Sequence, residues 1–331
     1  MEGLSYDGNG KFIMKASAIK PITLVLAREL TTTISLLLGV SVIAFLIILA
    51  SPGDPFAQLF GGFSGTESER LALYESLGIP TTWYGQYFSW LGNVVQGDLG
   101  TSIRSGQPVL GEVASAGVNT LYLTVGALII TLAIATPIAI YTAIRENSRL
   151  TLAYNLFAYM ISAIPVFWLG YLGIYLSTHL FGFFPLGLGS SDTGNVAKFL
   201  LPIFILGLGS GLISEVVRHM REQVSRVMNE EYIRTARAKG AVVWKHAFKE
   251  GFLIPVTEIM AIKMPFIIGG AIIIEQVFNW PGMGRMAWQA AQDRDFPVIL
   301  GITLAAAVLV RLSSLVHKLV FVSVNPRASH L

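Results

Sequence analysis

Long apolar stretches alternate with shorter polar segments along most of this 331-residue chain. Each stretch is long enough to cross a bilayer as a helix, which takes about 20 residues. The pattern therefore predicts an all-α integral membrane protein with about six transmembrane helices. The predicted spans, placed to within several residues, are 28–50, 118–143, 153–180, 197–217, 254–276 and 298–322.

Basic residues concentrate in alternate segments between these spans. Sixteen of the 23 lysines and arginines fall in the N-terminal segment, at residues 145–149, within 218–253 and near the C-terminus. Because cationic segments next to spans are retained in the cytoplasm, this bias predicts that both termini are cytoplasmic. A reversed orientation is the alternative, and it would leave most of the positive charge outside.

The composition supports the membrane assignment. Only 13% of the residues are charged, about half the share of an ordinary soluble domain. The chain contains no cysteine, which excludes a disulfide framework and a thiolate metal site. No small-residue cleavage site follows a short apolar core near the N-terminus, so the first span is predicted to be retained.

This topology divides the chain into consecutive parts. The longest cytoplasmic loop is 218–253, and the long outside segment carries six acidic residues against two basic ones. The predicted parts are a cytoplasmic extension (1–22), a first transmembrane helix (23–50), an extracytoplasmic segment (51–117), a five-helix core (118–322) and a cytoplasmic tail (323–331).

Two short helices are predicted within the extracytoplasmic segment. Apolar residues follow helical spacing in Leu71–Leu77 and in Trp83–Val95, and aromatic residues cluster on and around one face of the second. Such aromatics suit the level of the lipid headgroups. The core of a small cap subdomain is an equally good interpretation.

The longest cytoplasmic loop has a helical pattern at its centre. Tyr232, Ile233 and Ala236 fall on one side at helical spacing. Asn229 is a suitable N-cap and Gly240 a suitable C-terminal stop, so the sequence predicts a short, self-contained helix. A helix with small alanines and forked arginine donors can dock in a groove of another protein. Composition alone leaves open a solvated basic loop, or one attracted to anionic lipid.

The predicted helix resembles the coupling-loop motif of permeases from ABC importers of the dipeptide, oligopeptide and nickel class. The matching residues are Glu231, Tyr232, Ile233, Arg234, Thr235, Ala236, Arg237, Ala238, Lys239 and Gly240, followed by Leu253-Ile-Pro255. Further landmarks of that family occur in order along nearly the whole chain: Ser51–Pro55, Tyr87–Gly92, Gln96–Ser102, Ala163–Phe167, Glu275–Arg285, Asp295–Val298 and Asn325–Arg327. The stretch from Gly240 to Pro255 is a few residues shorter than is typical of the family.

The resemblance implies a B-type permease subunit with the type I ABC importer architecture. The implied partners are a second homologous permease, two ATP-hydrolysing subunits inside and a solute-binding protein outside. Membrane lipid is a further expected partner, and nucleic acid is not expected to bind. Short peptides are the expected substrate, and oligosaccharides or nickel complexes are alternatives within the class. The chain lacks a G-x-x-x-x-G-K-[ST] phosphate loop, so ATP and magnesium would be bound by partner subunits and this chain would hold no cofactor or metal.

Among the charged side chains inside predicted spans, Glu258, Lys263 and Arg311 stand out. A charge at the centre of a membrane helix costs about 2.5–3.5 kcal/mol on insertion scales, so each of them needs a partner or a function. The hypothesis is that Glu258 pairs with one of the two cations and that the other faces the translocation pathway. Snorkelling, or an ion pair inside the bundle, is the alternative.

The segment joining the last two spans is predicted to form a rigid turn, because prolines and glycines are concentrated there. Its candidates for an outer gate are Phe278, Trp280, Pro281, Gly282 and Arg285. An interfacial anchoring loop is the alternative, since tryptophan favours headgroup depth.

Two spans contain residues that should shape them. Pro165 predicts a kink in the third span. Gly207 and Gly211 have the small-xxx-small spacing that predicts close helix packing in the fourth.

Two other classes of membrane protein have similar hydropathy. An ATP-independent channel or secondary transporter is one, although such carriers often show internal repeats and none is evident here. A membrane-embedded enzyme is the other, but the spans lack paired aspartates and an H-E-x-x-H helix. The five histidines are scattered and form no ligand cluster in the sequence.

Overall fold

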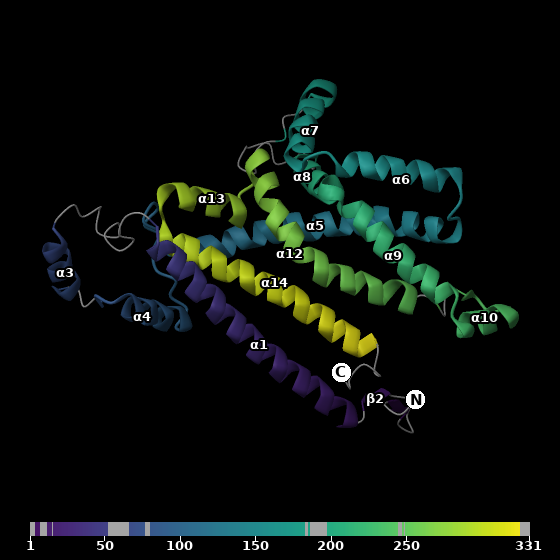
Figure 1. Ribbon diagram of the computed structural model, residues 1–331, viewed down its shortest axis with the longest axis horizontal. Coiled ribbons are helices and arrows are strands. Elements are labelled where there is room, and N and C mark those ends of the chain that lie inside the picture. Colours follow the sequence, from purple (N-terminus) through teal and green to yellow (C-terminus); the bar gives the residue numbers. More distant parts are fainter. Residues whose placement is uncertain are drawn as a thin grey trace. The chain divides into compact units, whose positions relative to one another are not determined.

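The computed structural model describes residues 4–6, 12–14, 16–51, 66–76, 80–182, 185, 197–243, 247 and 249–324, and the described part is almost entirely helical (Figure 1). The chain divides into two compact units. Unit 1 comprises Met1–Thr33, Leu121–Trp280 and Val310–Leu331, and unit 2 comprises Ile34–Thr120 and Pro281–Leu309.

Three continuous helices are long and apolar enough to span a membrane. They are α1 (Ala16–Leu49), α5 (Val109–Ile144) and α14 (Phe296–Val324), and their spanning parts are Arg28–Leu49, Val109–Ile144 and Phe296–Leu319. These helices confirm the first, second and sixth predicted spans. At 1.5 Å per residue α5 is about 54 Å long, well beyond the ~30 Å hydrocarbon layer, so its first turns extend into the predicted outside segment.

The third predicted span is broken rather than kinked. Helix α6 (Arg149–Ser162) and helix α7 (Val166–Phe181) meet at an angle of 96°. Pro165 occupies the N-cap position of α7 with φ −61° and ψ 138°. Proline has no N–H to donate and pushes the residue before it out of helical geometry, so α6 has to end before it.

The fourth predicted span also consists of two helices. Helix α8 (Ala197–Leu208) and helix α9 (Leu212–Met228) are bent by 57° around a 3-10 turn, η1 (Gly209–Gly211). Close packing is confirmed at Gly207, because a Cβ there would lie 2.9 Å from the carbonyl oxygen of Ala127 on α5. The Thr131 hydroxyl of α5 donates to the Gly207 carbonyl at 2.9 Å and fixes this approach.

Helix α9 continues to Met228, so the first part of the predicted cytoplasmic loop is helical. Its buried residues include Val216, Met220, Val224 and Val227, which recur at helical spacing and form one continuous stripe. Val216 and Met220 pack into the core of unit 1, whose buried side chains include Ile259 and Ile274 of the fifth span. Val227, at the end of the stripe, packs in a separate small cluster. The charged residues that kept this segment out of the predicted span lie on the other face.

The fifth span is helix α12 (Ile254–Val277), preceded by a π-helical turn, η2 (Lys249–Leu253). It contains Pro265, around which its two parts are bent by 54°. If each bent pair is counted as one span, the described chain has up to six spans, as the sequence predicts.

The described part of unit 2 contains three helices besides its parts of the long ones. Helix α3 (Glu67–Ser76) and helix α4 (Trp83–Val95) confirm the two short helices predicted outside. Helix α13 (Met283–Asp293) is not predicted by the sequence analysis, which treats this segment only as a turn. One core of unit 2 contains Phe45, Tyr87 and Phe296, and a second joins α5, α13 and α14.

A small hairpin precedes α1 in the N-terminal extension. Strand β1 (Leu4–Tyr6) pairs antiparallel with strand β2 (Phe12–Met14), with Ser5 opposite Ile13. The sequence analysis does not predict it. The cytoplasmic location of both termini stays a prediction.

Candidate functional site

The predicted docking helix is present as α10 (Glu231–Ala238). Lys239 forms its C-cap, and Gly240 follows with φ +69°, a left-handed conformation that glycine adopts without steric cost. The Ala241 N–H then donates to the carbonyl of Ala236 at 2.9 Å, which closes the end of the helix. The predicted stop at Gly240 is confirmed.

The predicted N-cap is wrong by one residue. Asn229 ends α9 instead, where its side-chain amide donates to the carbonyl of Ser225 at 2.9 Å. Glu230 takes the N-cap position of α10 with an extended backbone, and its side chain makes no capping hydrogen bond. The turn between α9 and α10 is therefore only two residues long, which leaves the two helices tightly connected.

Helix α10 is anchored by its apolar face. Ile233 is fully buried in a cluster with Val227 of α9 and Ala247, and Ala236 is nearly buried. Two of the ten predicted coupling residues, Ile233 and Ala236, therefore face inward. The expectation that Ala236 contacts a partner protein is wrong. The other eight are exposed, including Ala238 and the three cations of the segment.

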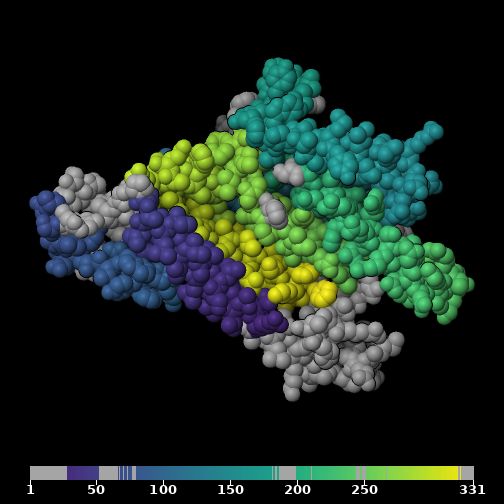
Figure 2. All heavy atoms as spheres, in the orientation of Figure 1, coloured from purple at the N-terminus to yellow at the C-terminus, as the bar shows by residue number. Residues whose placement is uncertain are grey.

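The exposed face of α10 is mainly charged. Arg234, Arg237 and Lys239 lie on it, together with Glu231 at the positive end of the helix. In Figures 1 and 2, α10 lies at the far end of α9, at the surface of unit 1. A rigid helix with forked guanidinium donors is suited to carboxylates in a groove of a partner protein.

Two of the three pathway candidates pair with residues of α9. Lys263 of α12 forms an ion pair with Glu215, and Glu258 lies 3.3 Å from the imidazole of His219. The expectation that Glu258 pairs with Lys263 or Arg311 is therefore wrong. Glu215 lies inside the predicted fourth span, whereas His219 lies beyond its predicted end, because α9 is longer than the sequence predicts. These contacts tie α9 to α12.

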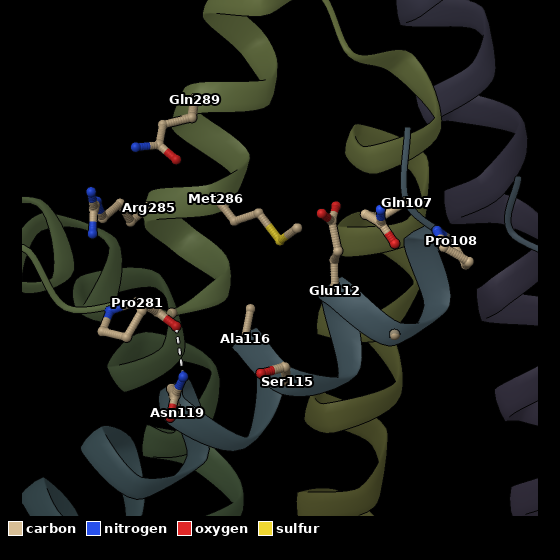
Figure 3. Close-up of a pocket in the computed structure, with 12 residues that line it drawn as sticks. Gln107, Pro108, Glu112, Ser115, Ala116, Asn119, Pro281, Arg285, Met286 and Gln289 are labelled. Atoms are coloured by element: carbon tan, nitrogen blue, oxygen red, sulfur yellow. Dashed lines mark hydrogen bonds between the residues drawn. The ribbon is translucent and has the colours of Figure 1, made fainter. Parts of the chain in front are cut away.

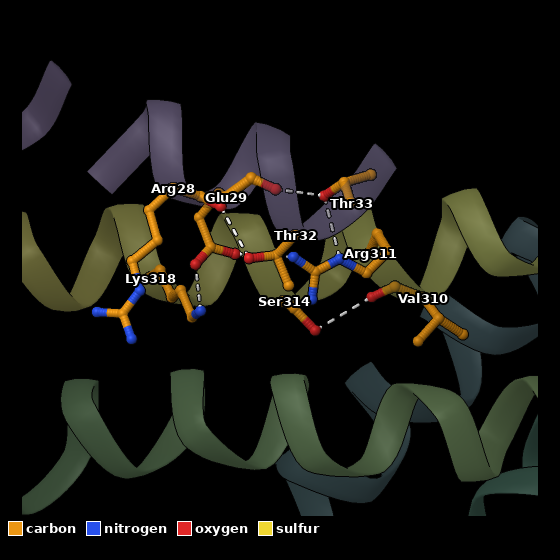
Figure 4. A network of polar contacts seen from close by, with 8 residues as sticks. All are labelled: Arg28, Glu29, Thr32, Thr33, Val310, Arg311, Ser314 and Lys318. Atoms are coloured by element: carbon orange, nitrogen blue, oxygen red, sulfur yellow. Dashed lines mark hydrogen bonds and ion pairs between the residues drawn. The ribbon is translucent and has the colours of Figure 1, made fainter. Parts of the chain in front are cut away.

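Arg311 of α14 pairs with Glu29 of α1, at 2.9 Å (Figure 4). Its Nε also donates to the hydroxyl of Thr33 at 3.1 Å, and Lys318 forms a second ion pair with Glu29. Glu29 is 5% exposed, so two cations compensate its burial. Glu29 is not among the residues predicted from the sequence, although an acid one residue inside a predicted span was the available signal. That any of these charges lines a pathway stays a prediction.

The gate candidates fall on both sides of a unit boundary. Phe278 and Trp280 belong to unit 1, where they are 1% and 3% exposed. The Trp280 ring packs edge-on against Phe199, with ring centroids 6.0 Å apart. The backbone N–H of Trp280 donates to the carbonyl of Glu275 at 2.8 Å. The expectation that Trp280 presents a bulky surface is wrong, because its side chain is buried.

The remaining gate candidates, Pro281, Gly282 and Arg285, belong to unit 2 and line one wall of a pocket of about 590 Å³ (Figure 3). The opposite wall is the first part of α5. The Asn119 side-chain amide donates to the carbonyl of Pro281 at 2.9 Å, and the Thr120 hydroxyl accepts from the N–H of Met283 at 2.8 Å. These bonds hold the start of α13 against α5. A gating role stays a prediction.

Two of the quoted landmarks meet in unit 2. The Ser102 hydroxyl donates to the buried carboxylate of Asp295 at 2.5 Å, and the Arg104 N–H donates to the same oxygen at 3.2 Å. Arg104 also pairs with Asp293 at 2.8 Å. The segment before α5 is thereby fastened to the junction between α13 and α14, far away in the sequence.

Comparison with known proteins gives a consistent assignment. A family model described as "Binding-protein-dependent transport system inner membrane component" matches residues 135–330, and a model of the N-terminal part of such components matches residues 22–141. The chain is 34% identical over 316 residues to the oligopeptide transport system permease protein AppB of Bacillus subtilis (strain 168), covering 92% of this chain and 98% of that protein.

A second relative is the glutathione transport system permease protein GsiC of Escherichia coli (strain K12), 33% identical over 306 residues, covering 90% of this chain and 96% of that protein. Among solved structures, the MetNI methionine ABC transporter in inward-facing conformations matches with a TM-score of 0.50 and 16% identity, over 64% of this chain and 96% of that one. At this identity the match shows the fold alone.

These matches confirm the resemblance found in the motifs. They do not fit a channel, a secondary transporter or a membrane-embedded enzyme, because the matched family is one of binding-protein-dependent transport systems and the relatives are named as their permease proteins. The chain therefore belongs to the family of binding-protein-dependent transport system inner membrane components, as a multi-pass permease subunit of an ABC importer of the dipeptide/oligopeptide type.

Proposed function

We propose that this chain carries short peptides across the membrane as one of two homologous permease subunits. Two ATP-hydrolysing subunits, which bind ATP and magnesium, drive the transport from the cytoplasmic side, and an external solute-binding protein delivers the peptide. The observation that carries the proposal is α10, whose exposed charged face and buried anchor form a docking element at the end of α9.

The contacts of α9 support a lever mechanism. Ile233 fixes α10 to the end of α9, so a partner that moves α10 also moves α9. Glu215 and His219 are four residues apart on one face of α9, and both hold α12 through their contacts with Lys263 and Glu258. Closure of the ATPase subunits would thus be transmitted as rigid-body motion of packed helices.

The substrate part of the proposal rests on the relatives. One is named for oligopeptides and the other for glutathione, itself a short peptide. Oligosaccharides and nickel complexes occur as alternatives in the resemblance, and no feature of the described residues favours them.

The test uses the transporter assembled with its ATPase subunits and binding protein. The double variant Arg234→Glu, Arg237→Glu reverses the charge of the exposed α10 face and should lower both co-purification of the ATPase and ATP-dependent uptake of labelled peptide at least tenfold. The matched control is Arg149→Glu, an exposed arginine at the start of α6. If no ATPase subunit accompanies the wild-type chain, or peptide uptake ignores ATP, the proposal fails.

A further inference from the structure

The pocket of unit 2 contains an acid without a partner. Glu112 on the first turn of α5 extends toward Met286 of α13 (Figure 3). Its side chain is half-buried, and within the part of the chain that the structure describes it makes no ion pair or side-chain hydrogen bond. A carboxylate that has lost part of its hydration without gaining a partner is poised to accept a cation.

The groups around Glu112 restrict the kind of cation. Gln107, Ser115 and Gln289 line the same pocket and contribute neutral amide and hydroxyl oxygens. An ammonium group donates three hydrogen bonds, which one carboxylate and such oxygens can accept. Arg285 lines the other wall of the pocket.

We propose that Glu112 binds the α-ammonium group of a short peptide as it enters the permease. This inference rests on the proposed peptide import and adds the chemical group that the pocket recognises. Its position supports it, because Pro281 and Gly282 line the wall opposite Glu112, and Glu112 lies on α5, which is long and apolar enough to span the membrane.

The test is the variant Glu112→Gln, which keeps the shape and removes the charge. Uptake of a peptide with a free N-terminus is measured in proteoliposomes at saturating binding protein, and docking of the unliganded binding protein is measured separately. We expect uptake to fall about tenfold, since a charge-assisted hydrogen bond is lost, while docking is unchanged. The matched control is Glu75→Gln, the same change on the exposed face of α3, which should leave both unchanged.

Three outcomes overturn the assignment. Unchanged uptake would mean that Glu112 only stabilises the positive end of α5. Weaker docking of the binding protein would mean that Glu112 contacts that protein instead of the peptide. An equal loss with an N-acetylated peptide that the wild type transports would show that no ammonium is recognised. Failure of the proposed function is distinct from these, because the wild type would then import no peptide.

A separate observation concerns the depth of α4. The hydroxyls of Tyr87 and Ser41 of α1 are hydrogen-bonded at 2.9 Å, and the rings of Tyr87 and Phe45 are 5.4 Å apart. Phe45 lies four residues before Leu49, where the first span ends, which is roughly 6 Å along the helix axis. Helix α4 therefore packs on the last turns of the span.

Next to its buried face, α4 carries an exposed apolar stripe. Tyr84, Phe88 and Val95 are 52%, 65% and 80% exposed, and they recur at helical spacing. No Asp, Glu, Lys or Arg occurs between Trp83 and Val95. On the neighbouring span, Ile43 and Ile47 are also exposed. A stripe of this kind is unusual in water.

We infer that α4 lies along the membrane surface, with this stripe in the boundary between lipid headgroups and acyl chains, where interfacial helices are buried by ~5–10 Å. Of the two interpretations that the sequence left open, the lipid one is thus favoured for Tyr84 and Phe88, while Tyr87 belongs to a protein core.

Because the chain has no cysteine, a spin label can be placed at one position of it through Phe88→Cys. In the reconstituted transporter the label should collide more with oxygen, which partitions into lipid, than with a water-soluble nickel chelate. A label at Glu75→Cys on α3 should show the reverse. If the Phe88 label prefers the nickel chelate, α4 faces water, and if it is shielded from both quenchers, a protein partner covers the stripe; either result overturns the inference.

Discussion

Replacing Ile233 by alanine should release α10 from α9 while the transmembrane helices remain folded. Ile233 is fully buried against Val227 and Ala247, and truncating a buried isoleucine to alanine costs about 2–5 kcal/mol. An eight-residue helix is marginal by itself, so this contact supplies much of its stability. A loss of about 2.7 kcal/mol corresponds to a roughly 100-fold change in the local opening equilibrium.

Hydrogen exchange of the full chain in lipid nanodiscs measures this opening directly. The amides of Arg234 to Ala238 should exchange about 100-fold faster in Ile233→Ala, and those of Val216 to Val224 in α9 should keep their protection. In the assembled transporter the same variant should hydrolyse ATP without importing peptide, because the lever between the ATPase and α9 is loose.

The control variant is Arg234→Ala, which changes an exposed neighbour of Ile233. It should leave exchange in α10 unchanged and weaken ATPase binding. The reasoning is refuted if Ile233→Ala leaves the protection of α10 intact, or if Arg234→Ala loosens the helix as much.

Three further changes test other contacts. Glu29→Gln should destabilise the chain by about 3 kcal/mol, because two cations lose a buried partner; an unchanged thermal midpoint in detergent would contradict this. Gly207→Ala should cost about 1–3 kcal/mol by the same assay, since its Cβ would meet the backbone of α5, whereas Gly92→Ala, with open space around it, should cost nothing comparable. The Thr66 N–H and hydroxyl donate to the Glu69 carboxylate and hold its pKa below the ordinary value. The ionised carboxylate therefore stabilises α3 at pH values above the ordinary pKa, and this stabilisation is lost as the pH falls through the lowered pKa. Glu69→Gln should make the amide protection of α3 independent of pH in this range, and an unaltered pH profile would contradict the prediction.

The helices and their approximate order follow from the sequence. A bilayer demands long apolar helices whose backbone groups are satisfied internally, so hydropathy alone locates the spans. The docking helix is equally local, because the apolar spacing around Ile233 and the left-handed Gly240 specify its face and its end. The ordered motifs then identify the family, which no single motif does.

Other features were decided only by the tertiary structure. Helix α9 extends to Met228 because its apolar stripe finds a buried surface, although its charges made the segment resemble a loop. The partner of Arg311 is Glu29, 282 residues away, and Ser102 meets Asp295 across 193 residues.

The physical reason is the range of the interactions. Helix formation and membrane insertion depend on neighbours a few residues apart, which the sequence displays directly. Partner choice for a charged group depends on which helices pack together, and that depends on the shape of many side chains at once. The sequence by itself thus determined the spans, α10 and the family, whereas the tertiary structure decided that Ile233 and Ala236 face inward, that Trp280 is buried and that Glu112 faces a pocket.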